Sequence, residues 1–333
     1  MKKAIFALSD FMFEKCYDKE TLARIHENFE VVGPNITKEN LKENMDLFAD
    51  VDVIFSGMGS IKYSDELMAA APNLEAIFYG AGSMKALLSD KVWEQDVTIT
   101  TANSINAIPV AEFTLSQILF TLKDGWKFVR ATRANKGKPA AINVHETAGN
   151  YKQTVGIISL SQIGRQTIAL LKPFDLDIIA YDPYVEKAEA DELGVTLVSL
   201  DEIFEQADVV SLHAPWLPET EKMITGDHFR KMKDGASFIN TARGAIVNEP
   251  EMLEVLEERA DITAILDVVY PEPPAEDSLI FTLDNIVYTP HIAGSTGNEL
   301  ARLGAVMADE AIRYINDEPL KHQITKETYE IMA

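Results

Sequence analysis

Four short apolar runs in the second half of the chain each lead into a chemically capable side chain. In chain order these side chains are His213, Arg243, Asp267 and His291. If the runs are strands of one parallel sheet, their carboxyl ends meet at the same edge, where Glu272 can join the group. A guanidinium there can bind a carboxylate, and an imidazole beside a carboxylate can act as a general acid/base. The pattern therefore predicts an active site at this edge.

Each of these residues also has an ordinary structural explanation. A lone histidine at the end of a strand is more often structural than catalytic, and Arg243 alone could form a surface ion pair. Asp267 could cap a turn, and the Pro-Glu-Pro-Pro segment at 271–274 could be a stiff linker. The hypothesis of an active site depends on the combination, which is hard to explain by coincidence.

A βαβ pattern precedes these residues. An apolar run rich in β-branched residues leads into a tight loop, a helical pattern, a proline and a second apolar run that ends at Asp182. This layout is typical of dinucleotide binding, with the pyrophosphate at the helix N-terminus and the acid on the adenosine ribose. The fingerprint is incomplete, because Ser159 and Ser161 occupy the usual glycine positions and only Gly164 remains.

The incomplete fingerprint leaves a second interpretation open, an ordinary α/β crossover in a flavodoxin-like domain. Serine at position 161 adds a Cβ and a hydroxyl where the backbone usually approaches the pyrophosphate. The hydroxyl could compensate by donating a hydrogen bond to a phosphate oxygen. We expect NAD to bind, somewhat less tightly than to a glycine loop.

Composition excludes several classes of partner. The chain has 333 residues, enough for two domains, and a formal net charge of −23, which argues against nucleic acid and anionic membranes. Its single cysteine, Cys16, permits no intrachain disulfide and suits a reducing cytoplasm. No apolar stretch reaches membrane-spanning length. We therefore expect a cytoplasmic protein whose partner is a small molecule.

The elements that must position the candidate residues follow an α/β alternation, typical of doubly wound parallel sheets with helices on both faces. We expect strands at 4–8, 30–33, 53–56, 76–79, 97–101, 154–159, 177–181, 209–212, 237–240, 263–266 and 286–288. An apolar helix is expected at 110–128, and a final amphipathic helix at 299–314. Asn248 is the expected N-cap of another helix, with Pro250 in its first turn and Glu251 as the capping-box acid.

The chain resembles the D-isomer-specific 2-hydroxyacid dehydrogenases, a family that includes phosphoglycerate, glyoxylate and formate dehydrogenase-like enzymes. The resemblance runs in order through nearly all of residues 75–300. The matching segments are YGAGS (79–83), AIPVAEFTL (107–115), VSLHAPWLPET (210–220), INTARGAIVNE (239–249), ILDVVYPEPP (265–274) and TPHIAGST (289–296).

The resemblance implies a catalytic set. Arg243 matches the arginine that binds the carboxylate and carbonyl of a 2-oxo acid, which suits a planar guanidinium. His291 matches the acid/base that protonates the carbonyl oxygen as hydride arrives, and Glu272 matches the carboxylate paired with it. Backbone amides at Ala81 and Gly82 match the loop that binds the substrate carboxylate. No metal is implied.

The resemblance also implies NAD as the cofactor. Asp267 matches the residue that holds the nicotinamide carboxamide, and Asp182 matches the ribose ligand. The other implied cofactor contacts are Ser161, Gln162, Ile163, Gly164, Ala214, Pro215, Thr220, Thr241, Ala242, Arg243 and Gly294.

The family fold implies two Rossmann-like or flavodoxin-like domains, with the cofactor domain inserted into the substrate domain. We expect the substrate domain at 1–102 and 297–333, and the NAD-binding domain at 103–296, with catalysis in the cleft between them. A homodimer is also implied, which the apolar helix fits.

The chain departs from the family pattern near the expected site. Trp216 stands where a smaller apolar residue is usual, and Val269 replaces a common aromatic residue. These departures bear on the shape of the substrate.

Three functions are compatible with the sequence. The first is an oxidoreductase that transfers a hydride between NAD(H) and a small 2-oxo acid or D-2-hydroxy acid. The second is a non-catalytic NAD-binding regulator on the same fold, and the third is a degenerate module that has lost the cofactor. Retention of the Arg243, Glu272 and His291 set favours the enzyme.

Overall fold

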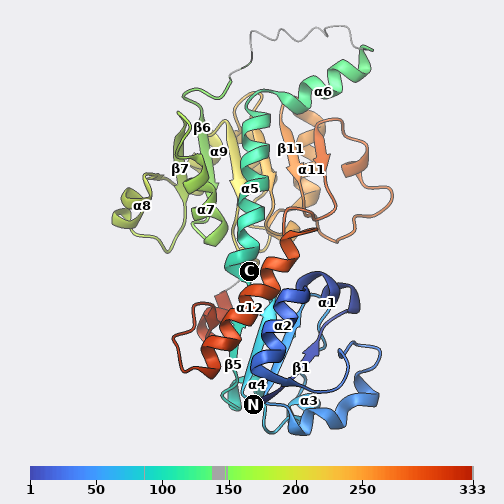
Figure 1. Ribbon diagram of the computed structural model, residues 1–333. Coiled ribbons are helices and arrows are strands. Elements are labelled where there is room, and N and C mark those ends of the chain that lie inside the picture. Colours follow the sequence, from blue (N-terminus) through green and yellow to red (C-terminus); the bar gives the residue numbers. More distant parts are fainter. Residues whose placement is uncertain (86, 137–146, 148, 332–333) are drawn as a thin grey trace. The chain divides into compact units, whose positions relative to one another are not determined.

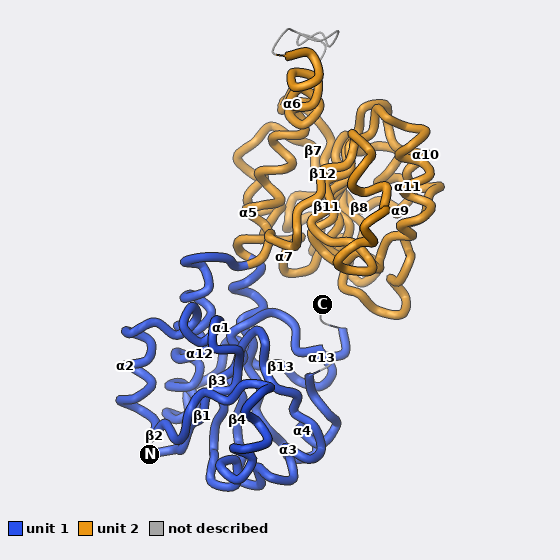
Figure 2. Tube along the Cα trace, turned by 90° about the vertical axis from the view of Figure 1, so that its right-hand side faces the viewer, with its two compact units in different colours: residues 1–107, 295–333 blue, residues 108–294 orange. Residues whose placement is uncertain are grey.

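The computed structural model describes residues 1–85, 87–136, 147 and 149–331. Within it the chain divides into two compact units, Met1–Ala107 with Ser295–Ala333, and Ile108–Gly294 (Figure 2). Each unit is a sheet covered by helices on both faces, so the α/β fold class predicted from the sequence is confirmed (Figure 1).

Unit 1 contains a six-stranded sheet in the order β13-β5-β4-β3-β1-β2. Only β13 runs antiparallel, against β5. The strands are β1 (Lys2–Ala7), β2 (Phe29–Val31), β3 (Val53–Gly57), β4 (Ala76–Gly80), β5 (Thr98–Thr101) and β13 (Gln323–Ile324). The helices are α1 (Asp10–Cys16), α2 (Lys19–Asn28), η1 (Leu41–Asp50), α3 (Asp65–Ala70), α4 (Asp90–Glu94), α12 (Glu299–Ile315) and α13 (Lys326–Ile331).

Alternation along the strands of unit 1 builds one core on each face of the sheet. On β1, Ala4 and Phe6 belong to the cluster that α1, α2 and α12 cover. Ile5 and Ala7 face the other cluster, which η1, α3 and α4 cover. Successive side chains of a strand point to opposite faces, so buried β1 is apolar on both sides.

Unit 2 contains a seven-stranded parallel sheet in the order β12-β11-β10-β9-β6-β7-β8. Its strands are β6 (Thr154–Ile158), β7 (Asp177–Tyr181), β8 (Thr196–Leu197), β9 (Val209–Leu212), β10 (Ser237–Asn240), β11 (Thr263–Leu266) and β12 (Ile286–Tyr288). Its helices are α5 (Asn103–Thr121, which starts in unit 1), α6 (Gly125–Ala134), α7 (Gln162–Leu171), α8 (Lys187–Leu193), α9 (Leu200–Gln206), α10 (Gly226–Lys231), η2 (Gly244–Ile246), α11 (Glu249–Glu258) and η3 (Leu279–Phe281).

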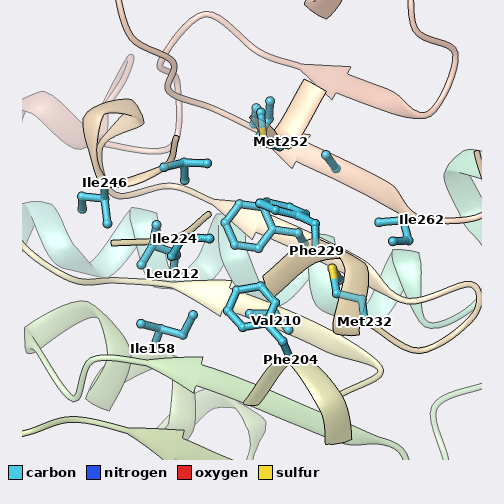
Figure 3. Close-up of a cluster of buried hydrophobic side chains, with 14 of the residues drawn as sticks. Ile158, Phe204, Val210, Leu212, Ile224, Phe229, Met232, Ile246, Met252 and Ile262 are labelled. Carbon is cyan, nitrogen blue, oxygen red and sulfur yellow. The ribbon is translucent and has the colours of Figure 1, made fainter. Parts of the chain in front are cut away.

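The strand order of unit 2 reverses at β6, with β7 on one side and β9 on the other. In open α/β sheets, ligands bind beyond the carboxyl ends of the strands at such a switch point. Phe204 and Phe229 lie in the buried hydrophobic cluster of this unit (Figure 3), which also contains Phe238. The rings of Phe229 and Phe238 meet edge to face with centroids 5.0 Å apart. The edge that carries the candidate residues thus belongs to a densely packed sheet.

The predicted strands are confirmed, with β7 and β9 to β12 at the predicted bounds and the others within two residues at each end. The sequence did not predict β8 and β13. Each has two residues and lies at an edge of its sheet, so neither carries enough alternation to be recognised.

The prediction of one helix at 110–128 is wrong. Helix α5 already begins at Asn103 and includes Pro109, and the chain breaks before α6. Asp124 adopts a left-handed backbone with φ of 52°, and the two helices are bent by 60°. Among the described residues, no single helix is long and apolar enough to cross a membrane; only this bent pair together reaches that length and composition.

Asn248 occupies the predicted N-cap position of α11, but its side chain forms no capping hydrogen bond. The Glu251 carboxylate instead accepts a hydrogen bond from the Gly226 amide at 2.9 Å. The predicted capping box is therefore wrong, because the Glu251 carboxylate binds the amide at the start of α10 and not the N-cap amide of Asn248.

Candidate active site

The candidate residues of unit 2 lie in the segments that leave its sheet at the carboxyl ends of the parallel strands. Ser161 follows β6, Asp182 follows β7, and the remaining segments follow β9 to β12 in the same sheet. The structure therefore brings to one edge the residues His213, Ala214, Pro215, Thr220, Thr241, Ala242, Arg243, Asp267, Glu272, His291 and Gly294.

An imidazole–carboxylate pair lies at this edge. Nδ1 of His291 is 2.9 Å from Oε1 of Glu272, and both side chains are exposed. Because Nδ1 is engaged by the carboxylate, Nε2 is the nitrogen that can exchange a proton with a ligand. His291 has a positive φ of 56°, which is uncommon for a non-glycine residue. Its amide donates to the carbonyl oxygen of Asp267 at 2.9 Å, which helps to hold the turn in this conformation.

Asp267 organises the turn that carries His291. Its buried carboxylate accepts hydrogen bonds from the Thr289 hydroxyl at 2.6 Å and from the amides of Ile292 at 2.9 Å and Ala293 at 2.8 Å. Two of these donors share Oδ1, and the third uses Oδ2. A carboxylate has about four acceptor positions, so one remains on Oδ2 for the carboxamide contact implied by the family.

Arg243 lies between the strand β10 and the short helix η2. Its Nη1 donates to the carbonyl oxygen of Ala242 at 2.7 Å. Burial lowers the pKa of the guanidinium, and the negative charge of Glu272 opposes that shift. Glu272, the carboxylate paired with His291, thus also lies within electrostatic range of Arg243. Gly244 is required here, because a Cβ would collide with the backbone of Val269.

The loop after β6 has the geometry of a phosphate cradle built with serines. Ser159 has a positive φ of 77°, the conformation for which glycine is usual. Gly164 packs so closely that a Cβ would collide with the Ser159 carbonyl oxygen. Ser161 is the N-cap of α7 and accepts from the Gly164 amide at 3.4 Å. In the described part of the chain, no acceptor is found for the amides of Gln162 and Ile163, so both are available to an anion.

Asp182 binds the same loop. Its Oδ2 accepts from the Leu160 amide at 2.8 Å and the Ser159 hydroxyl at 3.3 Å, and its Oδ1 accepts from the Tyr184 amide at 2.9 Å. One acceptor position on Oδ1 remains for a ribose hydroxyl. The loop amides and this carboxylate therefore fit NAD.

Several other predicted cofactor contacts use their polar groups inside unit 2. The Thr241 hydroxyl lies 3.2 Å from that of Thr114 on α5, and the Thr220 hydroxyl donates to the Pro215 carbonyl at 2.5 Å. Ala214 and Ala242 are buried. These residues can contact a ligand through backbone atoms and carbon surface, while their hydroxyls stabilise the loops.

His213 is a structural residue and not an acid/base. Burial lowers the pKa of its imidazole to about 3, so the ring is neutral near pH 7. Its Nε2 lies 2.9 Å from the Ser211 hydroxyl, and its Nδ1 has no partner among the described residues. This fits the structural explanation that the sequence left open for a histidine at the end of a strand, because a group that does not ionise near neutral pH is a poor proton carrier.

In unit 1, the predicted substrate loop follows β4. The Ala81 amide donates to the Tyr79 carbonyl at 2.8 Å, so it is not free to bind a carboxylate in this conformation. A Cβ on Gly82 would lie 3.5 Å from Oδ1 of Asn103 and 3.6 Å from Nδ2 of Asn106. The sequence analysis did not single out these two asparagines, which lie in the first turn of α5, shortly after the strand β5.

Comparison with known proteins identifies the family. The model of the D-isomer specific 2-hydroxyacid dehydrogenase, NAD binding domain, matches residues 115–293. The chain is 30% identical over 263 residues to the D-3-phosphoglycerate dehydrogenase of Archaeoglobus fulgidus, covering 79% of this chain and 49% of that protein. It is 29% identical over 300 residues to the hydroxypyruvate reductase of Thermotoga maritima, covering 89% and 95%.

A solved structure supports the fold. The D-mandelate dehydrogenase of Rhodotorula graminis superposes with a TM-score of 0.82 at 20% identity, covering 98% of both chains. The chain spans about half the length of the curated D-3-phosphoglycerate dehydrogenases it matches, at 49% of the Archaeoglobus fulgidus protein. Its resemblance to the hydroxypyruvate reductase extends over nearly the whole of that relative.

Proposed function

Because this chain belongs to the D-isomer specific 2-hydroxyacid dehydrogenases, whose NAD-binding domain it carries, we propose that it reduces small 2-oxo acids to D-2-hydroxy acids with NADH. The observation that carries the proposal is the 2.9 Å contact between His291 and Glu272, with Arg243 within electrostatic range of the same carboxylate. These groups supply a cation for the substrate and a proton for its carbonyl oxygen.

Arg243, His291 and Glu272 have distinct roles in the proposed reduction. Arg243 binds the substrate carboxylate and polarises the carbonyl, and the negative charge of Glu272 helps to keep the buried guanidinium charged. His291 donates the proton from Nε2 to the carbonyl oxygen, while Glu272 fixes the orientation of the ring through Nδ1. The bound nicotinamide supplies the hydride.

The remaining assignments extend this proposal. The amides of Gln162 and Ile163 bind the pyrophosphate, and Asp182 binds the adenosine ribose. Unit 2 is the cofactor domain. Unit 1 is the substrate domain, and its Gly82 amide binds the substrate carboxylate. Gly294 and the carbon surfaces of Ala214 and Ala242 contact the cofactor.

The proposed assembly is a cytoplasmic homodimer. Helix α6 has no buried residue, and Phe120 and Val129 of the α5–α6 region are 40% and 38% exposed. A second copy would cover this apolar surface. Cys16 is free and buried, as suits a reducing compartment. Sedimentation velocity at micromolar concentration tests the dimer, and a monomer would contradict it.

A panel of 2-oxo acids tests the function. NADH oxidation is measured with glyoxylate, pyruvate, hydroxypyruvate and phenylpyruvate, and the handedness of the product is determined by chiral chromatography. His291→Asn should abolish most of the reduction and leave NADH binding, measured by calorimetry, nearly intact. NADH binding without turnover of any acid would favour the alternative of a non-catalytic regulator.

A further inference from the structure

We propose that an exposed aromatic pair, Trp216 and Tyr270, binds the side chain of the substrate and selects 2-oxo acids with a large apolar, uncharged group. This inference rests on the proposed function and names its substrate class. The two rings meet edge to face with centroids 5.3 Å apart and an interplanar angle of 68°. Trp216 is 39% exposed and Tyr270 is 52% exposed, so the pair presents aromatic surface to solvent.

The pair adjoins the candidate catalytic residues. Tyr270 lies two residues before Glu272, in the segment that follows β11, and Trp216 lies in the segment that follows β9. In the sheet, β10 runs between these two strands and carries Arg243 at its carboxyl end. The aromatic contact therefore spans the strand end that would hold the substrate carboxylate. Ile292, the neighbour of His291, is 43% exposed and adds apolar surface at the same edge.

A side-chain hydrogen bond orients the indole of Trp216, and a backbone hydrogen bond holds the segment that carries Tyr270. Nε1 of Trp216 donates to Oε2 of Glu221 at 3.2 Å, and the Tyr270 amide donates to Oε2 of Glu249 at 3.2 Å. Fixed aromatic side chains bind apolar groups with little loss of conformational entropy. The aromatic surface is therefore preorganised for binding.

The charges around the pair disfavour an anionic substrate side chain. Glu221 and Glu249 bind its two members, and Glu272 follows Tyr270 in the chain. Arg243 would be occupied by the carboxylate and carbonyl that every 2-oxo acid presents. A phosphate on the substrate side chain would then meet aromatic rings and carboxylates, which repel it. The same surface attracts a phenyl or branched alkyl group.

Kinetics with matched variants test the inference. We expect wild-type kcat/KM for phenylpyruvate to exceed that for pyruvate by roughly tenfold or more, and a phosphorylated 2-oxo acid to be the poorest substrate. Trp216→Leu should lower kcat/KM for phenylpyruvate roughly tenfold, mainly through KM, and change that for pyruvate less than about twofold. Tyr270→Leu should act in the same direction.

Trp126→Leu is the matched control. Trp126 forms the other edge-to-face pair of a tryptophan in unit 2, with Phe120 at 5.0 Å, on the helices α5 and α6. Its loss should leave the ratio of the two substrates unchanged. If Trp216→Leu lowers kcat/KM for both acids equally, or if wild type prefers pyruvate or the phosphorylated acid, the inference is overturned while the dehydrogenase function stands. If no 2-oxo acid is reduced although NADH binds, the proposed function fails and the inference with it.

Discussion

The hydroxyl of Ser161 donates a hydrogen bond to the carbonyl oxygen of His213 at 2.9 Å. The hydroxyl oxygen of Ser161 also accepts a hydrogen bond from the amide of Gly164 at 3.4 Å, so Ser161 joins the N-terminus of α7 to the end of β9. The sequence suggested two possible effects of this serine. Its Cβ would crowd the pyrophosphate, or its hydroxyl would donate a hydrogen bond to a phosphate oxygen. The structure shows a third, in which the hydroxyl caps the helix and ties two strand ends together.

Replacing Ser161 separates these roles. Ser161→Ala should lower the free energy of unfolding by about 1 kcal/mol, because the cap and the bond to His213 are both lost. Ser161→Gly should cost only a few tenths of a kcal/mol and leave NADH affinity unchanged or slightly improved, since glycine is tolerated at N-caps and removes the Cβ. Urea unfolding and calorimetry measure the two quantities.

Ser199 provides the control for this experiment. It caps α9 through a capping box with Glu202, after β8, a strand that β7 separates from β6 in the sheet. Ser199→Ala should lower stability to a similar degree and leave the Kd for NADH unchanged. A large loss of NADH affinity in Ser161→Gly would instead mean that the hydroxyl binds the phosphate.

The buried His213 makes stability depend on pH. Burial lowers the pKa of its imidazole from 6.5 to about 3, so between these values the unfolded chain binds a proton that the folded chain does not. Its contribution to stability is therefore complete above about pH 6.5 and is lost as the pH falls toward 3. His213→Gln keeps a hydrogen-bonding group for Ser211 but removes this titration.

We expect wild type to be more stable than His213→Gln at pH 7, with the difference narrowing by about 1–2 kcal/mol at pH 5. Urea unfolding at both pH values measures it. A difference that stays constant over this range would show that the folded protein can protonate His213 or that its ring is exposed.

The sequence predicted which residues meet because apolar runs locate strands and parallel strands end at one edge. The bounds of β9 to β12 place Arg243, Asp267 and His291 just beyond the ends of three of these strands. The bounds themselves follow directly from the pattern of apolar residues. The contact between His291 and Glu272 was implied by family resemblance and not by spacing. Local pattern and global fold agree here, as in most natural sequences.

The direction of individual polar groups could not be predicted. The inward hydrogen bond of Ser161, the use of the Ala81 amide by Tyr79 and the three donors around Asp267 all depend on tertiary packing. The break between α5 and α6 depends on the left-handed backbone of Asp124, a residue with no glycine signal. Chain periodicity carries no information about such contacts.

Asp267 should act on catalysis through the turn that carries His291. In Asp267→Asn, one acceptor oxygen becomes a donor that faces the Thr289 hydroxyl or the amides of Ile292 and Ala293. The turn should shift, and because small misplacements are costly we expect kcat to fall roughly a hundredfold. NADH affinity should fall much less. Thr289→Val, which removes one donor, should have a milder effect in the same direction.

Stopped-flow reduction and calorimetric titration with NADH distinguish this role from the cofactor contact that the family implies. Retained kcat at saturating NADH together with lost NADH affinity would assign Asp267 mainly to the carboxamide.

Arg243→Ala should weaken substrate binding and slow the chemical step together, because the guanidinium serves the ground state and the transition state. Loss of two charged hydrogen bonds corresponds to a decrease in kcat/KM of roughly 10²–10⁴-fold. Arg243→Lys should restore only part of it, since an ammonium lacks the planar fork. Wild-type kcat/KM in the alanine variant would give Arg243 another role; NADH affinity, measured in parallel, identifies any general damage to the loop.

Asp182 should make the protein prefer NADH to NADPH. With the amides of Leu160 and Tyr184 and the Ser159 hydroxyl already bound, its remaining acceptor position suits a ribose hydroxyl. A 2′-phosphate would bring negative charge against this carboxylate, and the next residues, Pro183 and Tyr184, provide no cation to bind it.

Asp182→Ser tests the preference. It removes the repelling charge but keeps a small hydrogen-bonding side chain, so kcat/KM for NADPH should rise while that for NADH falls, and the ratio should move by roughly tenfold or more. The loop after β6 loses an anchor in this variant, which would weaken both cofactors alike. The ratio of the two values therefore isolates the electrostatic effect. Equal kcat/KM for NADH and NADPH in wild type would contradict the assignment of Asp182 to the ribose.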